Sequence, residues 1–192
     1  MKLYMVRHGQ SETNLSGCFT GWSQVNLTEQ GIQDAKRAGE YLKKFHFDRI
    51  YSSDLIRAVQ TAQNAIPGCE PIQDPLLREI GLGELELSNI AECSKRYGET
   101  FDEDRINLNF VPYGGENKAM LAVRVQAFLD KLAQDPCEQA VAFAHAGTLL
   151  TALELVMGAE INRRNVRCLN ASVAVFVCEN GRWQLQSWGL TH

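Results

Sequence analysis

The sequence predicts one α/β domain spanning residues 1–192, with a mostly parallel central sheet flanked by helices on both faces. Short apolar runs alternate along the chain with segments whose apolar residues recur at helical spacing, the pattern of sheets built from strand–helix–strand units. Two of these runs stop abruptly at a histidine, as expected of strands that end at a ligand site. A length of 192 residues, with 45% hydrophobic and 22% charged residues, is typical of one globular domain.

The first part of the chain predicts two strands, each followed by a helix. Residues 2–6 and 48–52 are short apolar runs with strand-forming residues. Thr28 is a suitable N-cap for the first helix, and Pro67-Gly68 ends the second. Apolar residues at helical spacing mark the inner faces of the two helices: Ile32, Ala35, Ala38, Gly39, Leu42 and Phe45 in the first, and Leu55, Ala58, Ala62 and Ala65 in the second.

Residues 71–115 are the least periodic part of the sequence. They predict one short helix at 90–97, and the remainder is polar and irregular. A long irregular segment inside a compact domain is more often a lid or a binding loop than filler, so we expect this segment to border the functional site.

The last third returns to regular alternation. Leu121, Val125, Phe128 and Leu132 mark an amphipathic helix, and residues 139–144 predict a buried strand. A helix follows from about residue 148 to residue 157. Residues 172–178 and 183–188, joined by Asn180-Gly181, predict a closing β-hairpin.

Composition and short sequence patterns disfavour several classes of function. A formal net charge of −4 disfavours nucleic-acid binding, and no apolar run reaches the roughly 18 residues that span a bilayer. The N-terminal run is too short for a signal peptide, so a cytoplasmic location is expected. The six cysteines form no C-x-x-C pair and the histidines are not at ligand spacing, so neither disulfides nor a metal site or other cofactor is expected.

Arg7 and His8 follow the first predicted strand, and His145 follows the strand at 139–144. The carboxyl ends of parallel strands meet at one edge of a sheet, so we expect both histidines to lie in one crevice. A neutral imidazole is an available nucleophile at pH 7, and an arginine side chain presents a planar fork to phosphate oxygens. The backbone amides of Ala146 and Gly147, at the start of a predicted helix, are further candidate donors to an anion.

Seven segments form an ordered set of motifs along the chain: Val6–Asn14 with its Arg-His-Gly, Phe19–Trp22, Leu27–Gly31, Tyr51–Ala58, Leu77–Gly83, Gly114–Glu116 and Ala144–Gly147. This set resembles the motifs of the histidine phosphatase superfamily, also called phosphoglycerate-mutase-like. The resemblance covers most of the chain and implies the phosphoglycerate-mutase-like fold.

The resemblance implies a role for each matching residue. His8 would accept the phosphoryl group, and Glu79 would act as general acid and then as general base. The expected catalytic set is His8, Glu79, His145, Arg7 and Arg57. The expected substrate contacts are Arg7, Asn14, Thr20, Gly21, Arg57, Ala146 and Gly147. His46 and His192 have no motif around them and are expected at the surface, and Cys18 is expected to be inert.

Within this family the favoured function is a metal-independent phosphomonoesterase. It would act on a small phosphorylated metabolite and release inorganic phosphate, as a monomer or a homodimer. The short stretch between Glu79 and Gly114, and Leu82 where the mutases carry a tyrosine, favour the phosphatase. Phe19–Trp22 favours the alternative, a cofactor-dependent phosphoglycerate mutase. A non-catalytic phosphate-binding protein is the second alternative.

The chain departs from typical small phosphatases beside the expected site. Leu85 and Leu87 replace the usual Trp and Gly after the acid motif, and Leu149-Leu150-Thr151 stands where a basic residue is usual. These changes predict a more apolar rim and a phosphomonoester with some apolar or ring character. α-Ribazole phosphate and phosphoglycerates are also compatible with the motifs.

Overall fold

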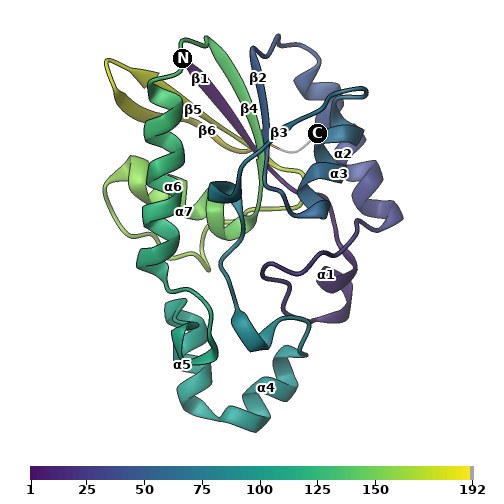
Figure 1. Ribbon diagram of the computed structural model, residues 1–192, viewed down its shortest axis with the longest axis vertical. Helices are drawn as coiled ribbons and strands as arrows, with labels where there is room; N and C mark the ends of the chain where they lie inside the picture. Colours follow the sequence, from purple (N-terminus) through teal and green to yellow (C-terminus); the bar gives the residue numbers. More distant parts are fainter. Residues whose placement is uncertain (191–192) are drawn as a thin grey trace.

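A computed structural model describes residues 1–190, and in these residues the strands form one six-stranded sheet (Figure 1). The strand order is β3-β2-β4-β1-β5-β6. The strands are β1 (Lys2–Arg7), β2 (Arg49–Ser52), β3 (Ile72–Gln73), β4 (Gln139–Ala144), β5 (Val173–Glu179) and β6 (Arg182–Leu190). β1 to β4 are parallel, and β5 runs antiparallel to both of its neighbours. The predicted mostly parallel α/β sheet is therefore confirmed.

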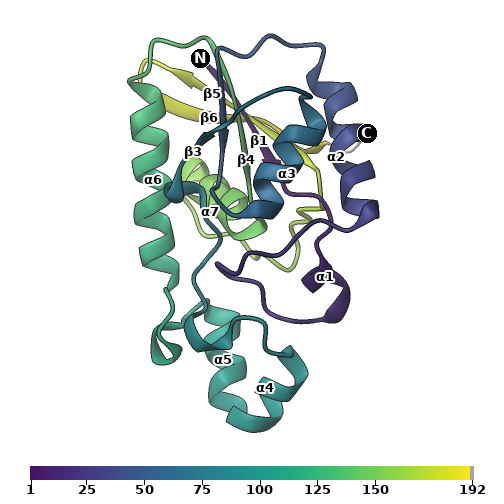
Figure 2. The ribbon, with the colours of Figure 1, turned by 45° about the vertical axis from the view of Figure 1, so that its right-hand side comes forward.

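Alternating side chains along the strands produce one core on each face of the sheet. Leu3 and Met5 point into a core covered by α6 (Lys118–Ala133) and α7 (Ala146–Met157). Tyr4 and Val6 point to the opposite face, which is covered by α2 (Glu29–Leu42) and α3 (Ile56–Ala65). Figures 1 and 2 show the two helix layers with the sheet between them. The prediction of helices on both faces is confirmed.

Local chemistry accounts for the ends of these elements. The Thr28 hydroxyl accepts a hydrogen bond from the Gly31 amide at 3.0 Å, so it caps α2 as predicted. The sequence places Phe45 on the apolar stripe of this helix, but α2 ends at Leu42 and Phe45 lies beyond it. Its ring still packs on the sheet, 4.8 Å from the ring of Tyr4, which explains its apolar character.

The β5–β6 hairpin also follows the prediction. Asn180 and Gly181 both have positive φ values, 51° and 75°, as the tight two-residue turns that match strand twist require. The second strand of the hairpin, β6, is longer than the predicted range 183–188 and runs from Arg182 to Leu190.

The segment 71–115 is more ordered than the sequence predicts. The helix expected at 90–97 is present as α4 (Ile90–Tyr97), but it is followed by an unexpected helix α5 (Glu99–Asn107). The short helix α1 (Glu12–Ser16) and the two-residue strand β3 are also absent from the sequence-based prediction. Three short 3₁₀ turns complete the segment: Pro75–Leu77, Gly83–Leu85 and Val111–Tyr113.

The helices α4 and α5 project beyond the sheet at the end where β1 and β4 finish (Figures 1 and 2). Phe101 anchors α5, since its ring lies 6.0 Å from Phe19 and 5.7 Å from Tyr113. Among residues 1–190, no helix is both long enough and apolar enough to span a bilayer.

Candidate active site

The two histidines of the predicted site lie side by side at the carboxyl ends of neighbouring strands. His8 follows β1 and His145 follows β4, and the register of these strands pairs Arg7 with Ala144. The ring centroids are 5.2 Å apart with an interplanar angle of 57°. Both side chains are buried. The predicted convergence of the two histidines at one edge of the sheet is confirmed, although only His8 lines the cavity there.

His8 is held as a neutral imidazole with a defined tautomer. Its Nδ1 lies 2.6 Å from the carbonyl oxygen of Gly9. A carbonyl oxygen only accepts hydrogen bonds, so Nδ1 carries the proton and the lone pair is on Nε2. Burial and the positive charges of Arg57 and Arg7 hold the pKa of His8 well below its usual value. Nε2, the atom expected to be the nucleophile, is therefore unprotonated at neutral pH.

A buried arginine, Arg57, and a half-buried one, Arg7, lie near this imidazole. Arg57 is 1% exposed and donates to the carbonyl oxygens of Gly21 and Ser23 at 2.7 and 3.0 Å. Arg7 donates through Nη1 to the carbonyl oxygen of Cys168 at 2.5 Å. Burial lowers the pKa of Arg57 to about 10, so the guanidinium stays charged at neutral pH. These backbone contacts fix the direction of both guanidinium groups.

The site has more hydrogen-bond donors than the surrounding protein atoms satisfy. Within residues 1–190, seven buried side-chain nitrogen or oxygen atoms lack a partner, and four of them are Nε of Arg7, Nε of Arg57 and both ring nitrogens of His145. Burial, followed by Arg57 and the neighbouring His8, holds the pKa of His145 well below its usual value. A neutral His145 still offers one N–H. A tetrahedral anion with several acceptor oxygens would satisfy these groups.

Glu79 enters the same site from the acid segment. Its Oε1 accepts from the amide of Ile80 at 2.9 Å, and its Oε2 accepts from the amide of Gly147 at 3.1 Å. The Gly147 amide, which the sequence assigns to the substrate, is thus occupied by Glu79 and serves to orient this carboxylate. The contact of Ala146 with substrate stays a prediction.

One cavity of about 270 Å³ joins most of the predicted site residues. Those that line it are Arg7, His8, Asn14, Thr20, Gly21, Arg57 and Glu79. His145, Ala146 and Gly147 are not among its lining residues, and His145 is fully buried beside His8. The rest of the lining consists of Cys18, Arg105 and six apolar residues: Phe19, Ile80, Leu82, Ile90, Leu108 and Phe110.

The substrate-contact candidates on the N-terminal loop are held by their neighbours. The Asn14 amide oxygen accepts from the Ser11 amide at 3.1 Å, and the Thr20 hydroxyl lies 2.5 Å from that of Thr13. Cys18 also lines the cavity. His46 is exposed, as predicted, and His192 lies outside the described residues.

Arg124, to which sequence reasoning assigns no role, binds the acid segment from α6. Its guanidinium donates to the carbonyl oxygen of Glu79 and to the Glu116 carboxylate. A signal was present, because Arg124 sits beside the apolar stripe of α6 and Glu116 belongs to the Gly-Gly-Glu motif. The sequence does not show that Arg124 and Glu116 bind the segment around Glu79, because that contact forms only in the tertiary fold.

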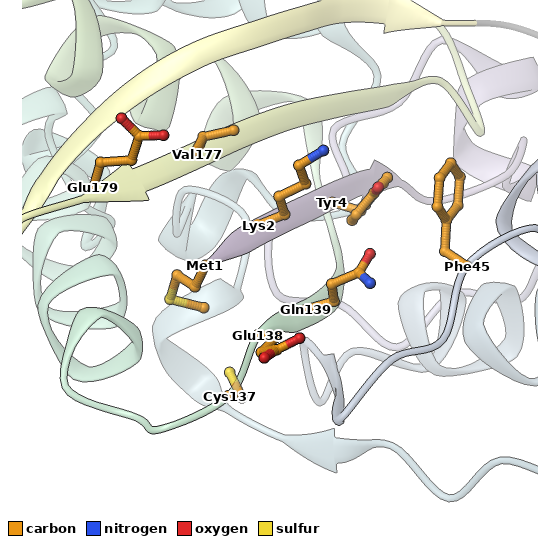
Figure 3. A pocket seen from close by; sticks show the side chains of 9 residues that line it. All are labelled: Met1, Lys2, Tyr4, Phe45, Cys137, Glu138, Gln139, Val177 and Glu179. Carbon is orange, nitrogen blue, oxygen red and sulfur yellow. The ribbon is translucent and has the colours of Figure 1, made fainter.

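A larger hollow, of about 660 Å³, lies at the opposite end of the strands (Figure 3). Lys2, Glu138 and Gln139 line it where β1 and β4 begin. Among the residues that the structure describes, no histidine or arginine lines this hollow. The side chains suited to phosphoryl chemistry lie instead at the carboxyl end of the sheet.

The fold and this site together define the class of protein. It is an α/β protein in which two arginines line a cavity beside a neutral histidine. The family model of the histidine phosphatase superfamily (branch 1) matches residues 3–191. The chain belongs to this superfamily, whose members are enzymes, phosphatases or mutases. The resemblance identified from the motifs is confirmed.

Curated relatives of the chain are described as mutases. A 2,3-bisphosphoglycerate-dependent phosphoglycerate mutase 2 of Latilactobacillus sakei subsp. sakei (strain 23K) is 43% identical over 105 residues, which are 51% of this chain and 46% of that protein. The chain thus matches about half the length of this relative. A 2,3-bisphosphoglycerate-dependent phosphoglycerate mutase from Brucella canis (strain ATCC 23365 / NCTC 10854 / RM-666) is 37% identical over 165 residues, covering 81% of this chain and 80% of that protein.

A solved structure with a similar fold is described as a phosphatase. The mycobacterial glucosyl-3-phosphoglycerate phosphatase in complex with VO3 superimposes with a TM-score of 0.86 at 27% identity and covers 99% of both chains.

Proposed function

We propose that the protein is a metal-independent phosphomonoesterase that transfers the phosphoryl group of a small phosphorylated metabolite to His8 and then to water. One observation carries the proposal. The Nδ1–H of His8 is committed to Gly9, which leaves the Nε2 lone pair available among the unsatisfied donors of Arg7, Arg57 and His145.

The reaction has two steps. Nε2 of His8 attacks phosphorus, the bond from phosphorus to the ester oxygen breaks, and the departing oxygen takes the proton of the Glu79 carboxyl. Water then attacks the phosphorus of the phosphohistidine and gives a proton to the Glu79 carboxylate. The bond from phosphorus to Nε2 breaks, and inorganic phosphate leaves with His8 restored. Arg7 and Arg57 stabilise the negative charge on the phosphoryl oxygens in both steps.

Two features support the phosphatase. The mycobacterial phosphatase matches 99% of both chains, while the Brucella mutase matches 81% of this chain and 80% of its own length. The apolar wall around Leu82 supports a substrate with some apolar or ring character. A cytoplasmic location and a monomeric or dimeric state remain predictions.

A phosphoglycerate mutase is the second candidate. Sequence identity favours it, because the relatives described as mutases are 37–43% identical and the mycobacterial phosphatase is 27% identical. In this case the phosphoryl group on His8 would return to a hydroxyl of a phosphoglycerate instead of passing to water.

The test is hydrolysis of p-nitrophenyl phosphate in excess EDTA by the wild type, His8→Ala and the exposed control His46→Ala. We expect activity in the wild type and in the control, with none in His8→Ala. Circular dichroism establishes that each variant is folded. Activity abolished by EDTA would overturn metal independence.

Separation from the mutase needs a second assay. Formation of 2-phosphoglycerate from 3-phosphoglycerate, in the presence of 2,3-bisphosphoglycerate, would be much slower than hydrolysis of the preferred phosphomonoester. If isomerisation is the faster reaction, the mutase replaces the phosphatase as the function.

A further inference from the structure

Hydrogen bonds fix both the side chain and the main chain of Glu79. Its carboxylate accepts from the Gly147 amide at 3.1 Å. Its backbone carbonyl oxygen accepts from Nε1 of Trp22 at 2.7 Å and from Nη2 of Arg124 at 3.0 Å. Two side chains from distant segments therefore converge on the main chain of the residue expected to move the proton.

Arg124 directs its whole guanidinium at the segment that contains Glu79. Nη1 donates to the carbonyl oxygens of Leu76 and Arg78 at 3.0 and 2.9 Å. Nε and Nη2 form a two-pronged ion pair with the Glu116 carboxylate at 2.8 and 2.7 Å. The five donor hydrogens of an arginine account for this arrangement, which a lysine with a single nitrogen does not reproduce.

Glu116 closes the arrangement from the other side. Its Oε2 also accepts from the Gly81 amide at 2.9 Å, so the pair holds the acid segment both before and after Glu79. The side chains of Arg124 and Glu116 are 16% and 10% exposed. A largely buried, two-pronged pair is a stiff support, since little water competes for its hydrogen bonds.

We propose that Arg124, supported by Glu116, is a positioning residue that holds Glu79 in the orientation required to protonate the leaving group. The proposal rests on the general-acid role of Glu79 in the proposed function. Arg124 and Glu116 do not line the cavity around His8, so they act through Glu79 rather than on the substrate.

Proton transfer is sensitive to this support because the acid must lie within about 2.6–3.2 Å of the oxygen that it protonates. A displacement of about 1 Å reduces the rate roughly 100-fold. Loss of the guanidinium would therefore slow the hydrolysis of substrates whose leaving group needs a proton. Hydrolysis of substrates whose leaving group departs as a stable anion would be little affected.

The experiment compares kcat/KM for phenyl phosphate and for 2,4-dinitrophenyl phosphate. Phenolate is a poor leaving group, since phenols such as tyrosine have a pKa of about 10, whereas dinitrophenolate leaves without a proton. The ratio kcat/KM reports only the steps through cleavage of the ester bond, so the later role of Glu79 as a base does not enter.

For Arg124→Met we expect kcat/KM for phenyl phosphate to fall about 30- to 100-fold and that for 2,4-dinitrophenyl phosphate to change less than about threefold. Glu79→Gln should show the same selective loss. Arg124→Lys should recover part of it, because one ammonium can still reach one of the acceptors.

Lys131→Met is the matched control. Lys131 lies on the same helix and binds Asp74 at 2.8 Å, just before the acid segment, but makes no contact with Glu79. Both substrates should be hydrolysed by this variant as by the wild type. If Arg124→Met does not fold, Arg124→Lys and Glu116→Gln are measured in its place and should show a smaller loss with the same selectivity.

An equal loss on both substrates, or no loss on either, would overturn the positioning role. Failure of the proposed function has a different outcome, in which the wild-type protein hydrolyses neither aryl phosphate.

Discussion

Gly147 has no side chain at the point where the Glu79 carboxylate approaches the start of α7. A Cβ at this position would lie 2.1 Å from Oε1 of Glu79, far inside van der Waals contact. The glycine therefore permits both the approach of the carboxylate and its hydrogen bond to the Gly147 amide.

For Gly147→Ala we expect the Glu79 carboxylate to move while α7 stays intact, since alanine is the better helix former. The value of kcat/KM for phenyl phosphate should fall about 10- to 100-fold through misplacement of the acid. The measurement is steady-state kinetics beside far-ultraviolet circular dichroism. Wild-type kinetics in a folded variant would show that the position of Glu79 does not limit the reaction.

The two buried histidines also make stability depend on pH. Their pKa values are well below normal in the folded protein, so the unfolded chain takes up protons that the folded chain does not. Their contribution to the free energy of unfolding is fully present above about pH 6.5, the ordinary pKa of histidine. It falls as the pH drops from there towards the pKa values of the folded state.

For each histidine that stays neutral in the folded state, the free energy of unfolding should decrease by about 1.4 kcal/mol between about pH 7.5 and about pH 5.5. His145→Gln should therefore lose less stability over this range than the wild type, as measured by urea unfolding at both pH values. An unchanged dependence in His145→Gln would contradict the argument.

The loop that follows β1 meets α2 through two glycines, Gly9 and Gly31, which leave no room for side chains. A Cβ on Gly9 would lie 2.2 Å from the carbonyl oxygen of Gly31, and a Cβ on Gly31 would lie 2.0 Å from that of Gln10. The loop that carries His8 thus rests directly on the first turn of α2. A third glycine, Gly39, allows α2 to approach α3, because a Cβ there would lie 2.3 Å from the carbonyl oxygen of Ala65.

These contacts provide a matched pair of variants on one helix. Both Gly31→Ala and Gly39→Ala should destabilise the protein by about 1–3 kcal/mol, because each inserts a methyl group against backbone. Only Gly31→Ala should also lower kcat, because it displaces the His8 loop, whereas Gly39 faces α3. Urea unfolding and kinetics under native conditions separate the two effects. Equal kcat values for the two variants would show that the loop tolerates the shift.

At the scale of the whole molecule, the sequence predicted the features that follow from its apolar periodicity and missed those that depend on distant partners. The convergence of His8 and His145 was predictable because parallel strands end at the same edge of a sheet. Helix α5 was not, because it is acidic and buries only Phe101, whose partners Phe19 and Tyr113 lie outside the helix. The role of Arg124 was missed for the same reason, since its acceptors lie 8 to 48 positions away in the chain.

The site joins segments that are far apart in sequence, so anything bound there should stabilise the fold as a whole. Arg7 and His8 follow the first strand, Arg57 lies on α3, and His145 follows β4. A ligand that binds only the folded state raises the free energy of unfolding by about 2.7 kcal/mol at 100 times its dissociation constant.

Inorganic phosphate, the expected product, should therefore raise the midpoint of thermal unfolding by about 5–10 °C at that saturation, given about 2–4 °C per kcal/mol for a chain of this size. The control is sodium chloride at equal ionic strength, which should produce a much smaller shift. Arg7→Gln should lose most of the phosphate-dependent increase, because it removes a guanidinium whose Nε has no partner in the protein. The same increase in wild type and Arg7→Gln would mean that phosphate acts as a general salt rather than through the crevice around His8.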